Sequence, residues 1–181
     1  MFHVMKIEST SFGPADLARF LDELIDRDRL ALVERLRRAS ARLGDLASRV
    51  PEGPAEWATV DAARWGAHEV LAHIAVLSKF YGVVAYQIGS GRLTEIDLLR
   101  QIAGRDVMGD RLARQPPAQL AALAQEDHRR TINWLQNATP ADLGRRCDTG
   151  AGGSMTAEEV ARLALCTHLE QHLDQLEATL S

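Results

Sequence analysis

The spacing of apolar residues is helical along almost the whole chain. Between residues 14 and 50, apolar positions recur at steps of three, four or seven, which predicts a long helix with one buried stripe. Gly13-Pro14 marks its start and the Pro/Gly-rich residues 51–54 mark its end. We expect a break near residues 38–44. The stripe consists of Leu17, Phe20, Leu21, Leu24, Ile25, Leu32, Leu36, Leu43, Leu46 and Val50.

Three further helical segments follow the first. The second is predicted from about residue 66 to residue 87, and the third runs from Pro116-Pro117 to about Asn137. The fourth begins at Thr156, where Glu159 lies at the spacing of a capping box, and it continues to the C-terminus. The connections are long: residues 89–115 include a short helical piece over 94–103, and residues 148–154 are dense in turn formers.

The absence of strand patterns sets the fold class. No segment of useful length alternates with a period of two, and no internal repeat is found. Four helices joined in this way predict an all-α fold, an antiparallel four-helix bundle with long connections. A chain of 181 residues is expected to form a single domain over residues 1–181.

Composition and charge exclude several classes of protein. The formal net charge is −4 and no basic recognition helix is present, so we expect no nucleic-acid partner. Unbroken apolar runs such as 74–77 and 82–86 are far shorter than the ~20 residues of a membrane span. The N-terminus lacks a secretory signal, and two cysteines are too few for a disulfide scaffold. We therefore expect a cytoplasmic protein without a membrane partner.

The last helix carries a pair of histidines with the spacing of a metal-binding site. His168 and His172 are four residues apart, which places them about 40° apart on the helix surface. Both imidazoles then reach a single metal ion at 2.0–2.1 Å. Leu165 and Leu176 flank the pair on the same side, which indicates that the pair faces inward. Gln175 lies on this face as well. The alternative is that both histidines are polar surface residues that bind no metal.

A third ligand has to come from another helix, and we choose His73. Its face borders the apolar side of the second helix, whereas His68 lies beside polar positions and is expected to be exposed. His68 and His73 are five residues apart, about 140° around the helix, so they cannot bind one ion as the HExxH motif of metalloproteases does. His128 has charged neighbours on both sides and is expected on the solvated face.

Other metal or nucleophile chemistry finds little support. No glutamate stands three residues before a histidine, so the Glu-x-x-His motif of di-iron bundles is absent from the sequence. His3 lies in the first few residues and is left aside. Cys166 is expected to be a buried apolar side chain. Cys147 lies in a loop before the fourth helix, and nothing nearby in the sequence supports a reactive thiol there. No general base, nucleophile or oxyanion donor can be assigned.

Two patches resemble the motifs of the DinB-like superfamily. Residues 65–73, Trp-Gly-Ala-His-Glu-Val-Leu-Ala-His, are similar to the W-S-x-x-E-x-x-x-H of that family, with Gly66 in place of the usual Ser or Thr. Residues 168–175 are similar to its H-x-x-x-H-x-x-Q. The resemblance covers nearly the whole chain. It implies that His73, His168 and His172 bind one divalent metal ion, zinc or nickel first and manganese or iron second.

The resemblance also implies an activity. Well-understood relatives are S-transferases that use mycothiol or bacillithiol, and maleylpyruvate isomerase, which depends on mycothiol. We therefore expect a metal- and thiol-dependent S-transferase or isomerase in detoxification or stress, acting on a low-molecular-weight thiol and an electrophile. A homodimer is expected as well. The alternatives are a non-catalytic metal-binding or interaction bundle, and a plain helical bundle whose histidines are incidental.

Overall fold

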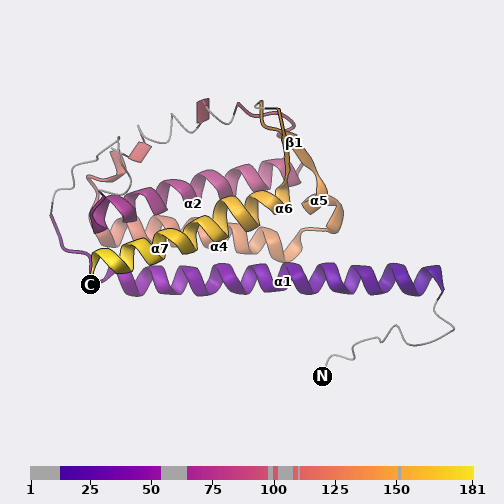
Figure 1. Ribbon diagram of the computed structural model, residues 1–181, viewed down its shortest axis with the longest axis horizontal. Coiled ribbons are helices and arrows are strands. Elements are labelled where there is room, and N and C mark those ends of the chain that lie inside the picture. The colour runs from indigo at the N-terminus through magenta and orange to yellow at the C-terminus, as the bar shows by residue number, and fades with distance from the viewer. Residues whose placement is uncertain (1–12, 54–64, 98–99, 102–107, 110, 151) are drawn as a thin grey trace, which may run out of the picture.

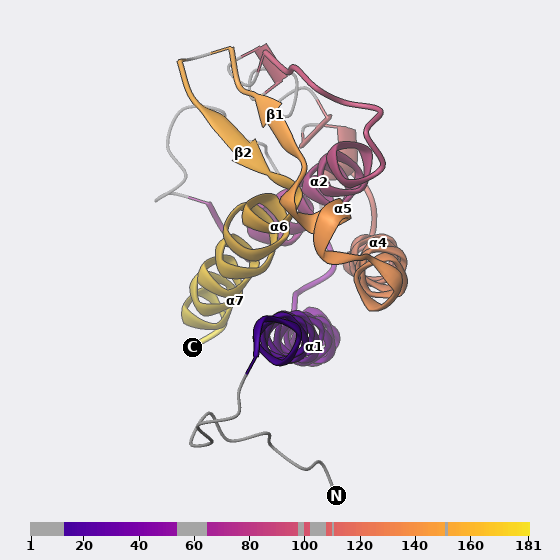
Figure 2. The same cartoon turned by 90° about the vertical axis from the view of Figure 1, so that its right-hand side faces the viewer.

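The chain is mostly helical, as the sequence predicts. The computed structural model describes residues 13–53, 65–97, 100–101, 108–109, 111–150 and 152–181. Three long helices pack side by side with a C-terminal helical stretch (Figures 1 and 2). The helices are α1 (Pro14–Ala47), α2 (Ala67–Gly89), α4 (Pro117–Asn137) and α5 (Pro140–Gly144), and the C-terminal stretch comprises α6 (Ala157–Glu159), η2 (Val160–Thr167) and α7 (His168–Thr179).

The central element of the core is α2. It packs against α4 on one side and against η2 and α7 on the other, while α1 packs against α4 and α7. The close approach of α2 to α4 needs two glycines. A Cβ atom on Gly82 would lie 2.5 Å from Oγ1 of Thr131, and one on Gly89 would lie 2.5 Å from the ring of Trp134. Any larger residue would push the two helices apart.

Burial also explains the composition of α2. By length and apolar content alone, α2 could cross a membrane. The unbroken apolar runs of the sequence are too short to do so. However, 67% of its most apolar stretch is buried by the other elements. A helix that is apolar on most sides is what a core position between two layers requires.

The first helix differs from its prediction in two ways. It continues without a break through residues 38–44, because the buried stripe from Leu32 to Leu46 keeps its helical period across this region. In contrast, Leu17, Leu21 and Leu24 belong to the same stripe but are 44–48% exposed. The other long helices are shorter than the 34 residues of α1, so the N-terminal part of α1 extends beyond them (Figure 1).

The predicted turn-rich segment at 148–154 connects the two strands of a small hairpin that the sequence does not indicate. Strand β1 (Arg146–Asp148) pairs antiparallel with β2 (Ser154–Thr156), and both are too short for a period of two to be recognised in the sequence. Glu95 forms a bridge to Asp148, so residues 94–97 are not helical as predicted. Most of the rest of the predicted piece at 94–103 lies outside the described residues.

The other predicted boundaries are close to those observed. The second helix begins one residue later and ends two residues later than predicted, and the third covers the expected range. The capping box is confirmed: the Thr156 hydroxyl accepts a hydrogen bond from the Glu159 backbone amide, and the Glu159 carboxylate accepts one from the Thr156 amide. The interaction ties the hairpin directly to the start of the C-terminal stretch.

The prediction for His128 is wrong, because its side chain is fully buried. Its charged neighbours point to other sides of α4, whereas His128 shares its face with Ala124 and Ile132, four residues away on either side. Its Nε2 lies 2.7 Å from Oγ of Ser78, and that hydroxyl donates to the carbonyl of Ile74 at 2.7 Å. The serine oxygen therefore accepts from Nε2–H of His128, and among the described residues Nδ1 has no partner.

This burial makes the stability of the protein sensitive to acid. Desolvation lowers the pKa of His128 to about 4, against about 6.5 in the unfolded chain. Between these values the unfolded chain binds more protons, so stability is fully present above pH 6.5 and declines as the pH falls toward 4. The contribution of His128 to the loss between pH 7 and pH 4.5 is roughly 2.5 kcal/mol.

Urea unfolding at pH 7, 5.5 and 4.5 measures this contribution. The variant His128→Gln keeps a hydrogen-bond donor toward Ser78 but does not titrate in this range. Its unfolding free energy is expected to fall less steeply with acid than that of the wild type, and all other histidines contribute equally to both proteins. Parallel pH profiles for the two proteins would contradict the prediction.

Candidate metal centre

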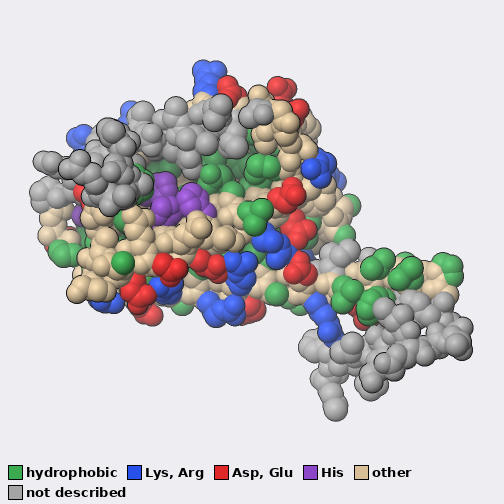
Figure 3. All heavy atoms as spheres, viewed as in Figure 1, with side chains coloured by type: hydrophobic (Ala, Val, Ile, Leu, Met, Phe, Trp, Pro, Cys, Tyr) green, Lys and Arg blue, Asp and Glu red, His purple; other side chains and the backbone are tan. Residues whose placement is uncertain are grey.

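The structure brings the three predicted ligands together. His73 lies on the second turn of α2, and His168 and His172 lie on the first two turns of α7, which packs against it. One nitrogen from each imidazole lies within 4.8 Å of the other two, and all three side chains are half-buried. Histidine side chains gather at one place on the surface of the face seen in Figure 3. Helices separated by about 100 residues of chain thus contribute to one site.

Hydrogen bonding to Gln175 orients His172. The Oε1 atom of Gln175 lies 2.9 Å from Nδ1 of His172, and because this oxygen only accepts, Nδ1 carries the proton. The lone pair of His172 is then on Nε2, which lies 2.9 Å from Nε2 of His168. Burial lowers the pKa of His172, and the bond to Gln175 opposes this in part. The net lowering favours the neutral imidazole, and the bond to Gln175 leaves its free nitrogen, Nε2, on the side of His168.

The donor set fits a divalent transition metal. Neutral imidazole nitrogens suit zinc and nickel, and an acceptor that fixes the tautomer of a ligating histidine is typical of metal sites. Tetrahedral binding at 2.0–2.1 Å places ligand nitrogens about 3.3–3.4 Å apart. The distance of 2.9 Å between Nε2 of His168 and Nε2 of His172, and the limit of 4.8 Å for all three histidines, bracket this spacing.

Two aromatic side chains border the cluster. The ring of Trp65 lies 4.8 Å from that of His73 and 6.5 Å from that of His172, centre to centre. The ring of Tyr81 lies 6.1 Å from that of His168. These rings pack against the imidazoles and limit the directions in which they can turn. Trp65 precedes Gly66, which is the N-cap of α2 with no side-chain bond, as expected for the departure from Ser or Thr.

The helix that leads into His168 is not an ordinary α-helix. Residues 160–167 form a π-helix, η2, which ends immediately before the first histidine of α7. The Thr167 hydroxyl donates to the carbonyl of Arg162, five residues earlier, at 3.0 Å. A π-helix has more residues per turn than an α-helix. The residues of η2 that face the core are therefore not those that a regular α-helix would turn toward it. A fixed period of 3.6 applied to the sequence cannot reveal it.

An ion pair that the sequence does not indicate holds α7 against α1. The Arg35 guanidinium donates to both carboxylate oxygens of Glu170, at 2.5 and 3.1 Å, and to the Thr167 hydroxyl at 3.2 Å. This fork-like geometry is the strongest form of such pairs. Glu170 lies between the two histidines in sequence, so the contact fixes the position of their helix. The residues are 135 positions apart, and no local pattern links them.

Of the other histidines and cysteines, some lie where the sequence predicts and others do not. His68 is half-buried rather than exposed, because its Nε2 lies 2.9 Å from the carbonyl of Gln115 and fastens the start of α2 to that segment. Cys166 is fully buried, as expected, and burial raises its pKa to about 11. Cys147 is buried in β1 and its pKa is also raised by burial, which disfavours the reactive thiolate. His3 lies outside the described residues.

A surface cavity of about 520 Å³ opens beside the cluster. His168 forms part of its wall, so a ligand in the cavity reaches this side of the candidate site. Leu163 is 58% exposed there, unusually so for a large apolar side chain. Most of the surface that lines the cavity is apolar, and the lining residues are Ser154, Met155, Glu159, Leu163, Ala164, His168 and Gln171.

Comparison with protein families identifies the class of protein. The family model of the DinB superfamily matches residues 31–176, which is well over half of the chain, so the chain belongs to the DinB superfamily. The match includes the three clustered histidines and Gln175, which confirms the resemblance seen in the two sequence motifs. Comparisons with curated proteins and with solved structures gave no match.

Removal of the Gln175 acceptor tests the orientation of His172. Gln175→Leu is expected to weaken zinc or nickel binding by ~10–100-fold, because Nδ1 loses the partner that fixes its proton and ring. The matched control is Gln171→Leu, an exposed glutamine one turn earlier on α7. Competition with a chromophoric chelator measures both affinities. Equal affinities for the two variants would show that Gln175 does not orient a ligand.

Proposed function

We propose that the protein binds one divalent metal ion, zinc or nickel, through His73, His168 and His172, and uses it to activate a small thiol. The observation that carries the proposal is the convergence of three half-buried imidazoles from two helices, with the Nδ1 proton of one fixed by Gln175. Membership of the DinB superfamily supports the same interpretation. Manganese and iron are less suited to an all-nitrogen donor set.

The reaction class follows from the donor set and its surroundings. Three neutral ligands would not offset the positive charge of a divalent ion, and they would leave one coordination position open. A thiol or water bound at that position would have a lowered pKa. Within the chain, burial favours the neutral form of His172, and Gln175 orients its ring. The cavity beside His168 accepts the apolar part of an electrophile on Met155, Leu163 and Ala164. This supports an S-transferase or isomerase with a mycothiol- or bacillithiol-type cosubstrate, in detoxification or stress.

A second candidate is a metal-binding protein without turnover. The observation that favours it is the state of Glu159, the one carboxylate among the described residues that line the cavity. This group caps the C-terminal stretch, and its hydrogen bonds with Thr156 lower its pKa, so it stays ionised and engaged. It is therefore a poor proton donor, and the chemistry of the first candidate has to come from the metal and the substrates.

The wider setting is proposed on the same basis. The packing of α1 with α4, and of α2 with α4 and the C-terminal stretch, supports an antiparallel four-helix bundle. We propose that the protein acts in the cytoplasm on small molecules, and the net charge of −4 supports a function that does not involve nucleic acid. A homodimer is part of the proposal as well.

Metal analysis of the purified protein tests the proposal. We expect about one zinc or nickel ion per chain, lost in His73→Ala, His168→Ala and His172→Ala but retained in His68→Ala, because the ring of His68 is bonded to the Gln115 carbonyl, outside the cluster. Circular dichroism of each variant shows whether it is folded. A metal-free wild type whose melting temperature does not rise with added zinc would overturn metal binding.

Turnover separates the two candidates. The metal-loaded protein is assayed with a generic electrophile and mycothiol, bacillithiol or glutathione, beside the metal-free His172→Ala variant. Thiol-dependent product formation by the loaded protein only would support the S-transferase or isomerase. Bound metal without turnover for any of these thiols would favour the non-catalytic protein.

A further inference from the structure

The N-terminal part of α1 extends past the rest of the structure. We call residues 14–27 the arm. At 1.5 Å per residue, the 34 residues of α1 measure about 50 Å, whereas α2 and α4 have 23 and 21 residues. Among the side chains described in α1, the first that is buried is Leu32. The family match begins at residue 31, so the arm lies outside the part of the chain that defines the family.

The arm carries an apolar face that the described residues do not cover. Leu17, Leu21 and Leu24 follow each other at steps of four and three, and each is 44–48% exposed. They continue the core stripe, since Leu21 and the buried Leu32 are three helical turns apart and differ by only about 20° around the helix. An isolated helix of this length is marginal in water, and its apolar face is stabilised by a partner.

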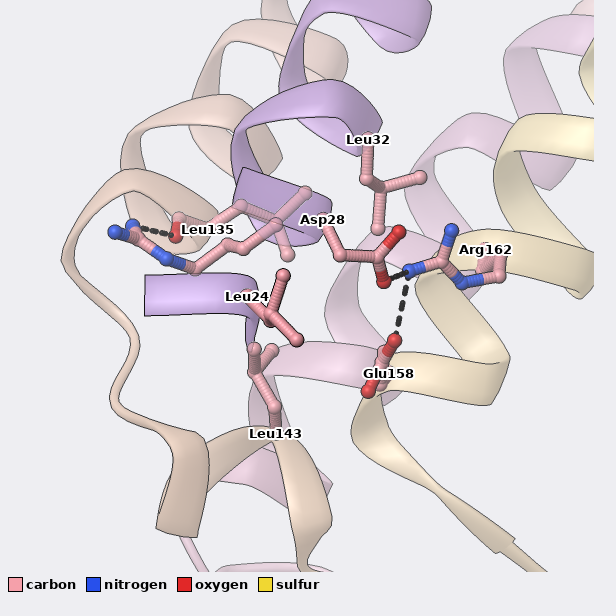
Figure 4. Close-up of a pocket in the computed structure, with 8 residues that line it drawn as sticks. Leu24, Asp28, Leu32, Leu135, Leu143, Glu158 and Arg162 are labelled. Atoms are coloured by element: carbon pink, nitrogen blue, oxygen red, sulfur yellow. Dashed lines mark hydrogen bonds and ion pairs between the residues drawn. The ribbon is translucent and has the colours of Figure 1, made fainter. Parts of the chain in front are cut away.

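The base of the arm is held firmly. Arg29 donates to the carbonyl of Leu135 at 2.8 Å, near the C-terminal end of α4. Asp28 is paired with Arg162, which also contacts Glu158 at 2.7 Å. Figure 4 shows these groups around a cavity of about 220 Å³, which we call the notch. Its apolar wall is formed by Leu24, Leu32, Leu135 and Leu143.

We propose that the arm is a dimerisation element and that its partner is the arm of a second copy of this chain, paired antiparallel across a two-fold axis at Leu21. The stripe is complementary to itself in this arrangement, because Leu17 and Leu24 lie on either side of the central leucine. A two-fold interface requires this kind of self-complementary patch. The proposal is independent of the metal centre.

The length and charge of the arm fit this pairing. Pro14, where α1 begins, is seven residues before Leu21, and Asp28 is seven residues after it. Pairing about Leu21 therefore places the first turn of one helix beside Asp28 of the other, at the edge of the notch. The N-terminal end of a helix carries a partial positive charge, and at that edge two carboxylates, Asp28 and Glu158, share the single guanidinium of Arg162. The apolar wall of the notch then covers the end of the incoming helix.

Leu21→Glu tests the arm, and Leu30→Glu is its matched control. Both leucines are 48% exposed on the same helix, and Leu30 lies about 180° from Leu21, away from the stripe. Light scattering after size exclusion, over a range of concentrations, is expected to show a dimer for the wild type and for Leu30→Glu. Two glutamates meeting at the axis should weaken the dimer of Leu21→Glu by at least ~100-fold.

Cross-linking tests the geometry. Under mild oxidation Leu21→Cys is expected to form a disulfide with itself across the axis, and Leu30→Cys is not, while the native cysteines are both buried. A wild type that is monomeric at every concentration would overturn the proposal, and it is the result expected if residues 1–12 or another protein cover the stripe. A dimer that survives Leu21→Glu would overturn it too, since its interface would then lie elsewhere.

Discussion

The burial of α2 between α4 and the C-terminal stretch is the constraint on which the rest of the structure depends. Gly82 and Gly89 let α4 approach on one side, and the apolar face around Leu77 packs on the other. Because both neighbours are fixed to this one helix, the position of His73 relative to α7 is set by core packing. The candidate metal centre is therefore built on rigid elements, which is what a precise ligand geometry needs.

The polar groups at the site maintain this arrangement. Arg35 holds α7 against α1 through Glu170, and Gln175 fixes the proton of His172. The π-helix η2 changes the helical phase immediately upstream of His168. An irregular helix next to a site is common where a side chain has to be presented at an angle that a regular helix does not offer.

The histidines illustrate how local patterns succeed and fail. His168 and His172 were recognisable because four residues make one helical turn, and His73 because its face borders the apolar side of its helix. His128 was misjudged from its charged sequence neighbours, although its spacing from Ala124 and Ile132 already placed it on the buried face. The polar neighbours of His68 predict exposure, and this prediction fails because the partner of its ring, the Gln115 carbonyl, is 47 residues away. Adjacent residues point in different directions on a helix, so periodicity was the better guide.

The sequence by itself determined the helical class, the boundaries of α2 and α4, the capping box at Thr156 and the three candidate ligands. All of these depend on contacts within one or two turns, or on motifs that such turns carry. Only the tertiary structure decided that α1 is continuous but half uncovered, that a hairpin precedes the last helix, and that Arg35 meets Glu170. The physical reason is that a side chain is buried only where a neighbouring element extends far enough to cover it. How far each helix extends relative to the others is fixed only when the helices pack together.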